Sequence, residues 1–160
     1  MALRESAPPR KKIVMSDENI LSQRFEIRGG DFSNAGKAST SIKEILQEIG
    51  IDSSIIIRAS IASYEAEMNV VMYAQRGSLT LNITPEKLHF KLEDDGPGIE
   101  NIELAMQEGF STATDKMREM GFGAGMGLPN IKKNADKFEI SSKPGKGTSL
   151  DIIICLNKTE

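Results

Sequence analysis

The segment Glu65-Ala-Glu-Met-Asn69 places the carboxylate of Glu65 and the side-chain amide of Asn69 four residues apart. Residues at this spacing lie on the same face of an α-helix, so Glu65 and Asn69 would project together from a helical segment. A carboxylate and an amide placed side by side could share one polar ligand. Glu67 follows Glu65 by two residues and points to another side of such a helix, so we expect it at the surface.

Three glycine-containing segments follow this pair along the chain. Asp94-Asp-Gly-Pro-Gly98 sets an acidic side chain before a turn that carries almost no side chains. Gly121-Phe-Gly-Ala-Gly-Met-Gly127 runs into a helical pattern, and the free N–H groups and positive dipole end of a helix start suit a phosphate. Gly145-Lys-Gly-Thr148 opens the last strand pattern. Such glycines either loosen a linker or let a ligand come close to the backbone.

The spacing of these glycines excludes two common nucleotide-binding motifs. A dinucleotide-binding fold needs Gly-x-Gly-x-x-Gly after its first strand, and no glycine here lies three residues beyond a Gly-x-Gly pair. A P-loop needs Gly-Lys followed by Ser or Thr, whereas Gly145-Lys146 is followed by Gly147. A nucleotide site in this chain would therefore be built differently.

The hydrophobic pattern predicts the elements that position these segments. Apolar spacings of three and four predict helices, and alternation predicts strands. We expect helices at 38–49, from 55 to near 77 and at 127–137, and strands at 24–28, 78–83, 87–92, 138–142 and 148–156. The second and third strands would form an antiparallel hairpin. Within the second helix we expect an apolar stripe made of Ile57, Ile61, Tyr64, Met68, Val71 and Met72.

The order of these elements favours one fold class. Helices come early, antiparallel strands lie in the middle and at the end, and no regular βαβ alternation occurs. This order is typical of an α+β sandwich with helices on one face of a sheet.

The composition limits the class of protein. The chain has 160 residues, of which 39% are hydrophobic and 27% charged, as in a single soluble globular domain. We expect one domain at residues 21–158 after a flexible tail at residues 1–20. The net charge of -3 argues against direct binding to nucleic acid or an anionic membrane, and no apolar run is long enough to span a bilayer. The single cysteine cannot form an internal disulfide, which fits a cytoplasmic location.

Taken together, the motifs resemble those of a known superfamily. Four segments of this chain resemble, in the same order, the asparagine box and the three glycine boxes of the GHKL ATPases. They are Glu65-x-x-x-Asn69, Asp94-x-Gly96-x-Gly98, Gly123-x-Gly125-x-Gly127 and Gly145-x-Gly147-Thr148. The resemblance extends over residues 24 to 156. Within the superfamily, the chain is most similar to the anti-sigma-factor and stress-switch serine/threonine kinases. We expect a lone ATPase domain, and Gly109-Phe-Ser-Thr-Ala113 lies ahead of Met126-Gly-Leu-Pro-Asn130 as in those kinases.

The resemblance implies a fold, a nucleotide and a base pocket. The fold would be the Bergerat ATP-binding fold, a two-layer sandwich with helices on one face of a mixed, largely antiparallel sheet. The ligand would be ATP with Mg²⁺. Asp94 matches the aspartate that accepts a hydrogen bond from the adenine amino group. Gly96 and Gly98 would let the backbone approach the base, and Thr148 would complete the pocket.

The resemblance also implies the residues around the phosphates. Asn69 matches the magnesium ligand, and Glu65 matches the residue that activates the attacking water or hydroxyl. The third box would wrap the triphosphate with the backbone of Gly123, Gly125 and Gly127. Residues 107–120 would form a lid, in which the side chains that could touch phosphate are Ser111, Thr112, Lys116 and Arg118.

Three functions are compatible with these motifs. The first is a kinase that phosphorylates serine or threonine on a small antagonist protein and also binds a sigma factor or a similar regulator. The second is an ATP-dependent binding switch that transfers no phosphate. The third, a stand-alone histidine-kinase-like ATPase domain, is disfavoured because the only histidine, His89, lies within a strand pattern. None of the three requires direct contact with nucleic acid or a membrane, and a homodimer stays open.

Overall fold

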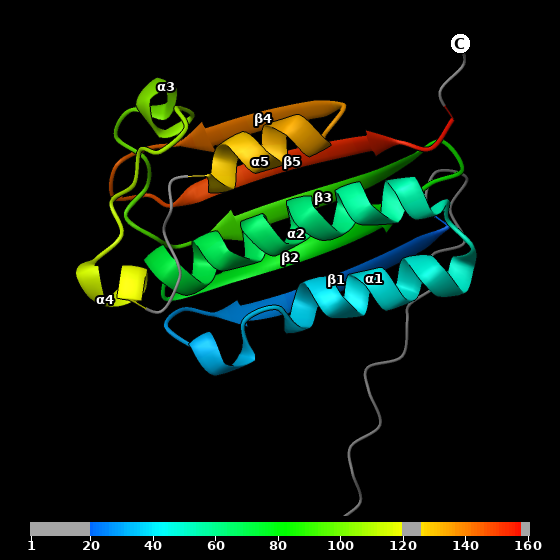
Figure 1. The fold of residues 1–160 in the computed structure, drawn as a ribbon, viewed down its shortest axis with the longest axis horizontal. Helices are drawn as coiled ribbons and strands as arrows, with labels where there is room; N and C mark the ends of the chain where they lie inside the picture. Colours follow the sequence, from blue (N-terminus) through cyan, green and yellow to red (C-terminus); the bar gives the residue numbers. More distant parts are fainter. Residues whose placement is uncertain (1–19, 120–125, 158–160) are drawn as a thin grey trace, which may run out of the picture.

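The computed structural model describes residues 20–119 and 126–157 (Figure 1). The predicted tail therefore lies, except for Ile20, outside the described residues. The elements in chain order are β1 (Leu21–Arg28), the 3-10 helix η1 (Phe32–Asn34), α1 (Lys37–Ile49), α2 (Ser53–Tyr73), β2 (Arg76–Ile83), β3 (Lys87–Asp94), α3 (Ile102–Ala105), α4 (Asp115–Glu119), α5 (Gly127–Asn134), β4 (Lys137–Ser142) and β5 (Thr148–Cys155). Every predicted helix and strand is present, while η1, α3 and α4 are additional.

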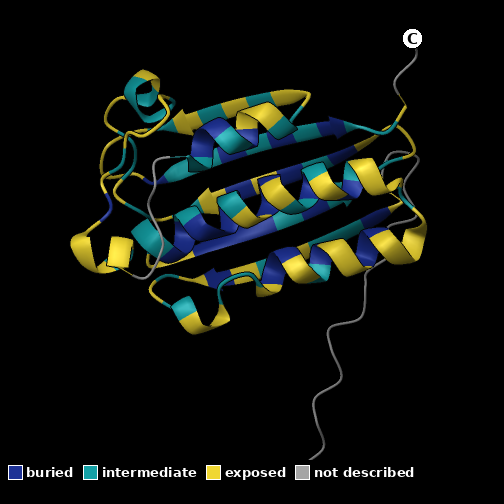
Figure 2. Ribbon diagram, viewed as in Figure 1, coloured by how far each residue is buried: buried dark blue, intermediate teal, exposed yellow. Residues whose placement is uncertain are grey.

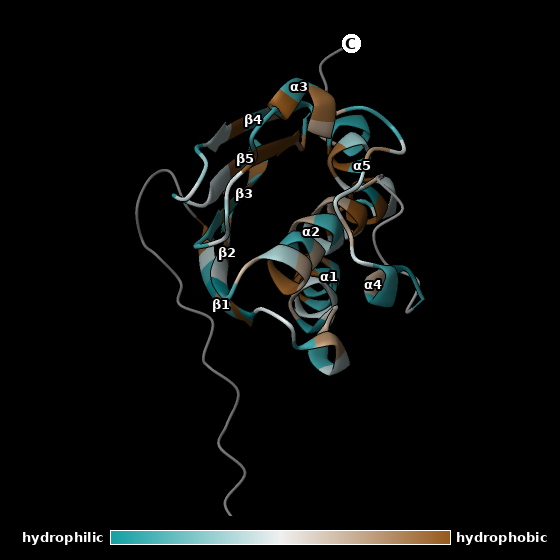
Figure 3. Cartoon of the chain, turned by 90° about the vertical axis from the view of Figure 1, so that its left-hand side faces the viewer, coloured by the Kyte–Doolittle hydropathy of each residue, from teal (hydrophilic) through white to brown (hydrophobic). Residues whose placement is uncertain are grey.

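The five strands form one sheet in the order β1-β2-β3-β5-β4. All four described pairings are antiparallel, so the described sheet is antiparallel throughout rather than mixed. Figure 3 shows the strands nearly end on, with the sheet as one layer and α1, α2 and α5 as the other. The predicted α+β class, with helices on one face, is confirmed.

The core lies between the two layers. Along β2, Leu79, Leu81 and Ile83 face the helices and are buried, as alternation predicts, and Thr80 and Asn82 point to the other face. Figure 2 shows the buried residues between the helices and the sheet, with exposed residues on the outer sides of the helices. The polar outer face of the sheet explains why its strands alternate so clearly in sequence.

The buried face of α2 differs from the predicted stripe. Ile57 and Ile61 are 61% and 37% exposed, whereas Ile56 and Ala59 are buried. The prediction was wrong for Ile57, Ile61 and Tyr64 because α2 packs on α1, α5 and the sheet at once. The helix approaches these neighbours closely through small residues, including Ala62 and Ala66. A helix covered on several sides has no single apolar stripe in its sequence.

Glu67 was predicted at the surface, and the structure corrects this. Its side chain is buried and accepts hydrogen bonds from the backbone N–H groups of Gly36, Ala38 and Ser39 at 3.0, 3.3 and 3.0 Å. The first turn of α1 has neither an acidic residue nor a side-chain cap of its own. The carboxylate of Glu67 on α2 supplies the missing acceptor at the positive end of the α1 dipole.

Candidate functional site

A cavity of about 1130 Å³ opens at the end of the molecule where α2 ends and α5 begins. This is the left-hand end in Figure 1, where β3 also ends and β5 begins. The residues that line it include Glu65, Asn69, Asp94, Gly127 and Thr148. The structure therefore brings together residues from all four motifs, which lie up to 83 positions apart in the sequence (148 minus 65).

Asp94 is held rigidly at the end of β3. Its Oδ1 accepts hydrogen bonds from the backbone N–H groups of Gly96, at 2.9 Å, and Thr148, at 3.1 Å. Burial raises the pKa of this carboxyl above its usual range, although the two N–H groups oppose the shift; the nearby charge of Asp95 adds to the rise. The other oxygen, Oδ2, can accept a hydrogen bond from a ligand.

Two glycines pack the turn after Asp94 against the β4–β5 connection. A Cβ on Gly98, which has a φ of +79°, would lie 2.2 Å from the carbonyl oxygen of Lys143. A Cβ on Gly147, also at +79°, would lie 2.0 Å from the carbonyl oxygen of Asp94. Both glycines thus allow backbone to contact backbone, which fixes the two loops beside each other. Gly96 and Gly98 also line the cavity.

Glu65 and Asn69 lie together, one helical turn apart on α2, and both face the start of α5. A Cβ on Gly127 would lie 3.3 Å from Oε2 of Glu65 and 3.6 Å from Oδ1 of Asn69. The amide of Asn130 donates a hydrogen bond to Oε1 of Glu65 over 3.3 Å. Asn130 received no role from the sequence, although its position three residues after Gly127 places it on the same face of α5.

The oxygens of Glu65 and Asn69 fit a cation that takes its other ligands from elsewhere. Carboxylate and amide oxygens are the ligands that Mg²⁺ prefers, and protein sites for Mg²⁺ commonly rely on substrate phosphates and water as well. Within residues 20–119 and 126–157, no group of three or more His, Cys, Asp and Glu side chains could hold a metal ion. A metal at this site would thus depend on the ligand.

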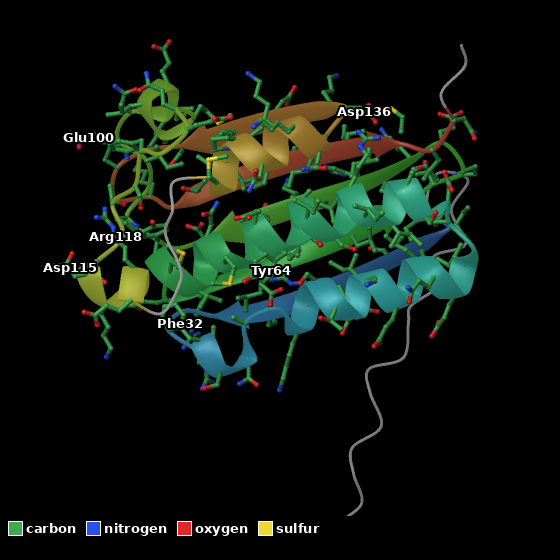
Figure 4. The ribbon with its side chains drawn as sticks, viewed as in Figure 1. Phe32, Tyr64, Glu100, Asp115, Arg118 and Asp136 are labelled. Atoms are coloured by element: carbon green, nitrogen blue, oxygen red, sulfur yellow. The ribbon has the colours of Figure 1, made fainter. Side chains whose placement is uncertain are left out.

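The predicted lid divides into two parts. Ser111 and Thr112 line the cavity, and Oγ of Ser111 accepts a hydrogen bond from Ala113 N at 3.1 Å. Lys116 and Arg118 are exposed on α4 and are not among the described residues that line the cavity. Figure 4 shows Arg118 at the same end of the molecule as the cavity.

Two further predicted residues lie beyond what the structure describes. Gly123 and Gly125 of the third glycine box fall within residues 120–125, outside the described ranges. Of that box, only Gly127 is placed.

His89 lies away from the cavity. It alternates with Leu88 and Phe90, which are buried under the helices, so its side chain is on the outer face of the sheet. There its Nε2 lies 2.8 Å from Oδ1 of Asp151 on the neighbouring strand β5. This position gives His89 no access to the cavity.

Comparison with known proteins agrees with this geometry. Residues 56–160 match the family described as histidine kinase-, DNA gyrase B-, and HSP90-like ATPase. The chain is 30% identical over 115 residues to the serine/threonine-protein kinase RsbT of Bacillus subtilis, which covers 69% of this chain and 80% of that protein. It is 31% identical over 114 residues to the anti-sigma F factor of a Thermoanaerobacter species, which covers 71% of this chain and 72% of that protein.

A solved structure shares the fold. The SiaB-SiaC complex from Pseudomonas aeruginosa contains a chain that matches with a TM-score of 0.57 at 13% identity, covering 82% of this chain and 88% of that one. The match to the ATPase family extends over most of the chain and includes Glu65, Asp94 and Thr148. The chain therefore belongs to the histidine kinase-, DNA gyrase B- and HSP90-like ATPases, the GHKL superfamily that its motifs resemble.

Proposed function

We propose that the chain is an ATP-dependent protein serine/threonine kinase of the anti-sigma-factor type, which phosphorylates a small antagonist protein. The observation that carries the proposal is the convergence of Glu65, Asn69 and Gly127 in the same cavity as Asp94 and Thr148. The similar proteins are named a serine/threonine-protein kinase and an anti-sigma F factor. These names support transfer of the phosphate to a serine or threonine of another protein.

In this proposal, ATP lies with its base at Asp94 and its phosphates at Gly127. Oδ2 of Asp94 accepts a hydrogen bond from the adenine amino group, because Oδ1 already accepts hydrogen bonds from two backbone N–H groups. The phosphates lie at the start of α5, whose first N–H groups and positive dipole end favour an anion. The absent side chain of Gly127 lets the start of α5 approach the two α2 side chains closely.

Glu65 is the proposed general base. It accepts the proton of the serine or threonine hydroxyl as that oxygen forms a bond to the γ-phosphorus and the bond from the γ-phosphorus to the β,γ-bridging oxygen breaks. The products are a phosphorylated residue and ADP. Oε2 is the oxygen for this role, because Oε1 accepts the hydrogen bond from Asn130.

Asn69 is the proposed protein ligand of Mg²⁺. Its Oδ1 faces the start of α5, where the phosphates would lie. The bound ion would neutralise charge on the phosphates. The chain's own contribution is to hold the amide oxygen beside Glu65 from the same face of α2.

We further propose that the partner is a separate small protein in the cytoplasm. None of the helices in the described ranges is both long and apolar enough to cross a lipid bilayer. The position of His89 on the outer face of the sheet argues against autophosphorylation of histidine at this site. A homodimer stays a prediction.

Labelling with ATP tests this function. The purified chain is incubated with ATP labelled at the γ-phosphate and with proteins captured on the immobilised chain, and the labelled residue type is identified. Label on serine or threonine of a captured protein, and its loss with Glu65→Gln, supports the kinase. An ATP-dependent complex without transferred label would replace the kinase with the binding switch.

A further inference from the structure

The hydroxyl of Ser142 connects three segments around the proposed base pocket. Ser142 is the last residue of β4, and its Oγ accepts a hydrogen bond from Ile99 N at 2.7 Å. The same oxygen lies 3.0 Å from the carbonyl oxygen of Gly147 and 2.9 Å from Oγ1 of Thr148. The side chain also lines the cavity. None of the sequence motifs includes this residue.

The direction of these hydrogen bonds follows from the number of protons available. A carbonyl oxygen can only accept, so the contact with Gly147 uses the single proton of the Ser142 hydroxyl. The contact between the two hydroxyls then requires Thr148 to be the donor and Ser142 the acceptor. Oγ1 of Thr148 consequently presents only lone pairs to the cavity that it lines.

Asp94 presents the same polarity beside Thr148. The two residues are paired across β3 and β5, and the backbone N–H of Thr148 donates to Oδ1 of Asp94 at 3.1 Å. An ionised carboxylate can only accept hydrogen bonds. Asp94 and Thr148 therefore form one hydrogen-bond-accepting patch. The Thr148 hydroxyl could otherwise rotate, and its hydrogen bond to Ser142 fixes its orientation.

We propose that Ser142 is a specificity-determining residue, which selects a purine with an amino group at position 6 by making the Thr148 hydroxyl an acceptor. This rests on the proposed function, in which ATP occupies the cavity. Adenine has an amino group with two protons at position 6, whereas guanine has a carbonyl oxygen there. A 6-oxo purine in the position of adenine would set its 6-oxygen against the two acceptors. Both acceptors would then lack a donor, which weakens binding strongly.

Binding of three nucleotides to the full chain tests this assignment. ATP, GTP and purine riboside triphosphate, which has a hydrogen at position 6, are titrated into the wild type, Ser142→Ala and the control Ser141→Ala, whose residue is exposed at the neighbouring position. We expect the wild type and the control to prefer ATP over GTP by about 100-fold or more. Ser142→Ala should lower the ratio of the affinity for ATP to the affinity for GTP by about tenfold. The affinity for purine riboside triphosphate should change by less than about threefold.

Several results would overturn the assignment. An ATP-to-GTP ratio in Ser142→Ala equal to that of the wild type, or an equal loss of affinity for all three nucleotides, would reduce Ser142 to a structural role. If Ser142→Ala does not fold, Ser142→Cys, with its weakly bonding thiol, and Thr148→Val are measured in the same way, and both must narrow the ratio. A wild-type chain that binds none of the three nucleotides would instead contradict the proposed function itself.

Discussion

The side-chain amide of Asn130 donates a hydrogen bond to Oε1 of Glu65 over 3.3 Å and so links the first turn of α5 to α2. The second carboxylate oxygen, Oε2, is the one that lies near Gly127. Because the amide occupies one oxygen, it determines which oxygen of Glu65 is turned toward the proposed phosphate position. The orientation of the proposed base thus depends on a residue of another helix.

Asn130→Ala should therefore slow phosphate transfer more than it weakens ATP binding. Loss of this hydrogen bond frees the Glu65 carboxylate to rotate, and we expect kcat to fall about tenfold with the affinity for ATP nearly unchanged. Lys132→Ala, an exposed position on the same helix, is the control. A variant with normal kcat and reduced ATP affinity would show that Asn130 supports binding rather than the base.

Glu65→Gln should retain nucleotide binding and lose most turnover. The amide cannot take up the proton of the acceptor hydroxyl, and a positioned base contributes about a hundredfold or more to such a step. Steady-state transfer and ATP titration are measured on the same preparation, with Glu44→Gln on the exposed face of α1 as the control. Normal transfer by Glu65→Gln would place the base elsewhere.

Glu67→Gln should destabilise the fold without a specific effect on the site. The buried carboxylate accepts three backbone N–H groups at the start of α1, and glutamine has one oxygen in place of two and no charge. We expect the free energy of unfolding to fall by about 1–3 kcal/mol in urea titrations. Glu44→Gln serves again as the control, and equal stability of the two variants would show that this cap contributes little.

Asp94→Asn should abolish most ATP binding and change the pH dependence of stability. Burial raises the pKa of Asp94, so the folded state holds this proton more tightly than the unfolded state does. The contribution of Asp94 to stability is therefore largest in acid and decreases as pH rises from its unfolded pKa, 3.8, through the raised folded pKa. The free energy of unfolding of the nucleotide-free protein is measured across this pH range, and the decrease should be absent in Asp94→Asn. A pH profile of Asp94→Asn equal to that of the wild type would contradict the raised pKa.

Gly147→Ala should be far more damaging than Gly145→Ala. Both glycines have a positive φ, +79° and +78°, so an added Cβ strains the backbone equally in the two variants. At Gly145 nothing lies within 4 Å of that Cβ, whereas at Gly147 the carbonyl oxygen of Asp94 would lie 2.0 Å away. Thermal unfolding and ATP titration should show a larger loss for Gly147→Ala, and equal losses would mean that the close approach is not required.

Much of this architecture could be predicted from the sequence because its signals are local. Alternation in β2 and β3 arises from a sheet with one buried face, and the asparagine and glycine boxes keep fixed spacings. The pairing of Glu65 with Asn69 followed from one helical turn. The short helices α3 and α4, with four and five residues, contain too few turns for a periodic signal.

Other features depend on contacts between distant segments and could not be predicted from one sequence. Glu67 is buried because α1 has no cap of its own and the capping carboxylate comes from α2, 31 positions away from Gly36. Ile57 is exposed because α2 contacts two helices and the sheet, which shifts its buried face to the alanines. Ser142 and Asn130 gain their partners only when the strands and helices pack.

The location of bound nucleotide tests the central claim most directly. A crystal structure of the chain with Mg²⁺ and a non-hydrolysable ATP analogue should show the adenine amino group within hydrogen-bond distance of Oδ2 of Asp94. Its γ-phosphate should lie at the start of α5 beside Gly127, next to the pair Glu65 and Asn69, with Mg²⁺ on Oδ1 of Asn69. An analogue bound outside this cavity, or with its base beside Glu65 and its phosphates beside Asp94, would contradict the account.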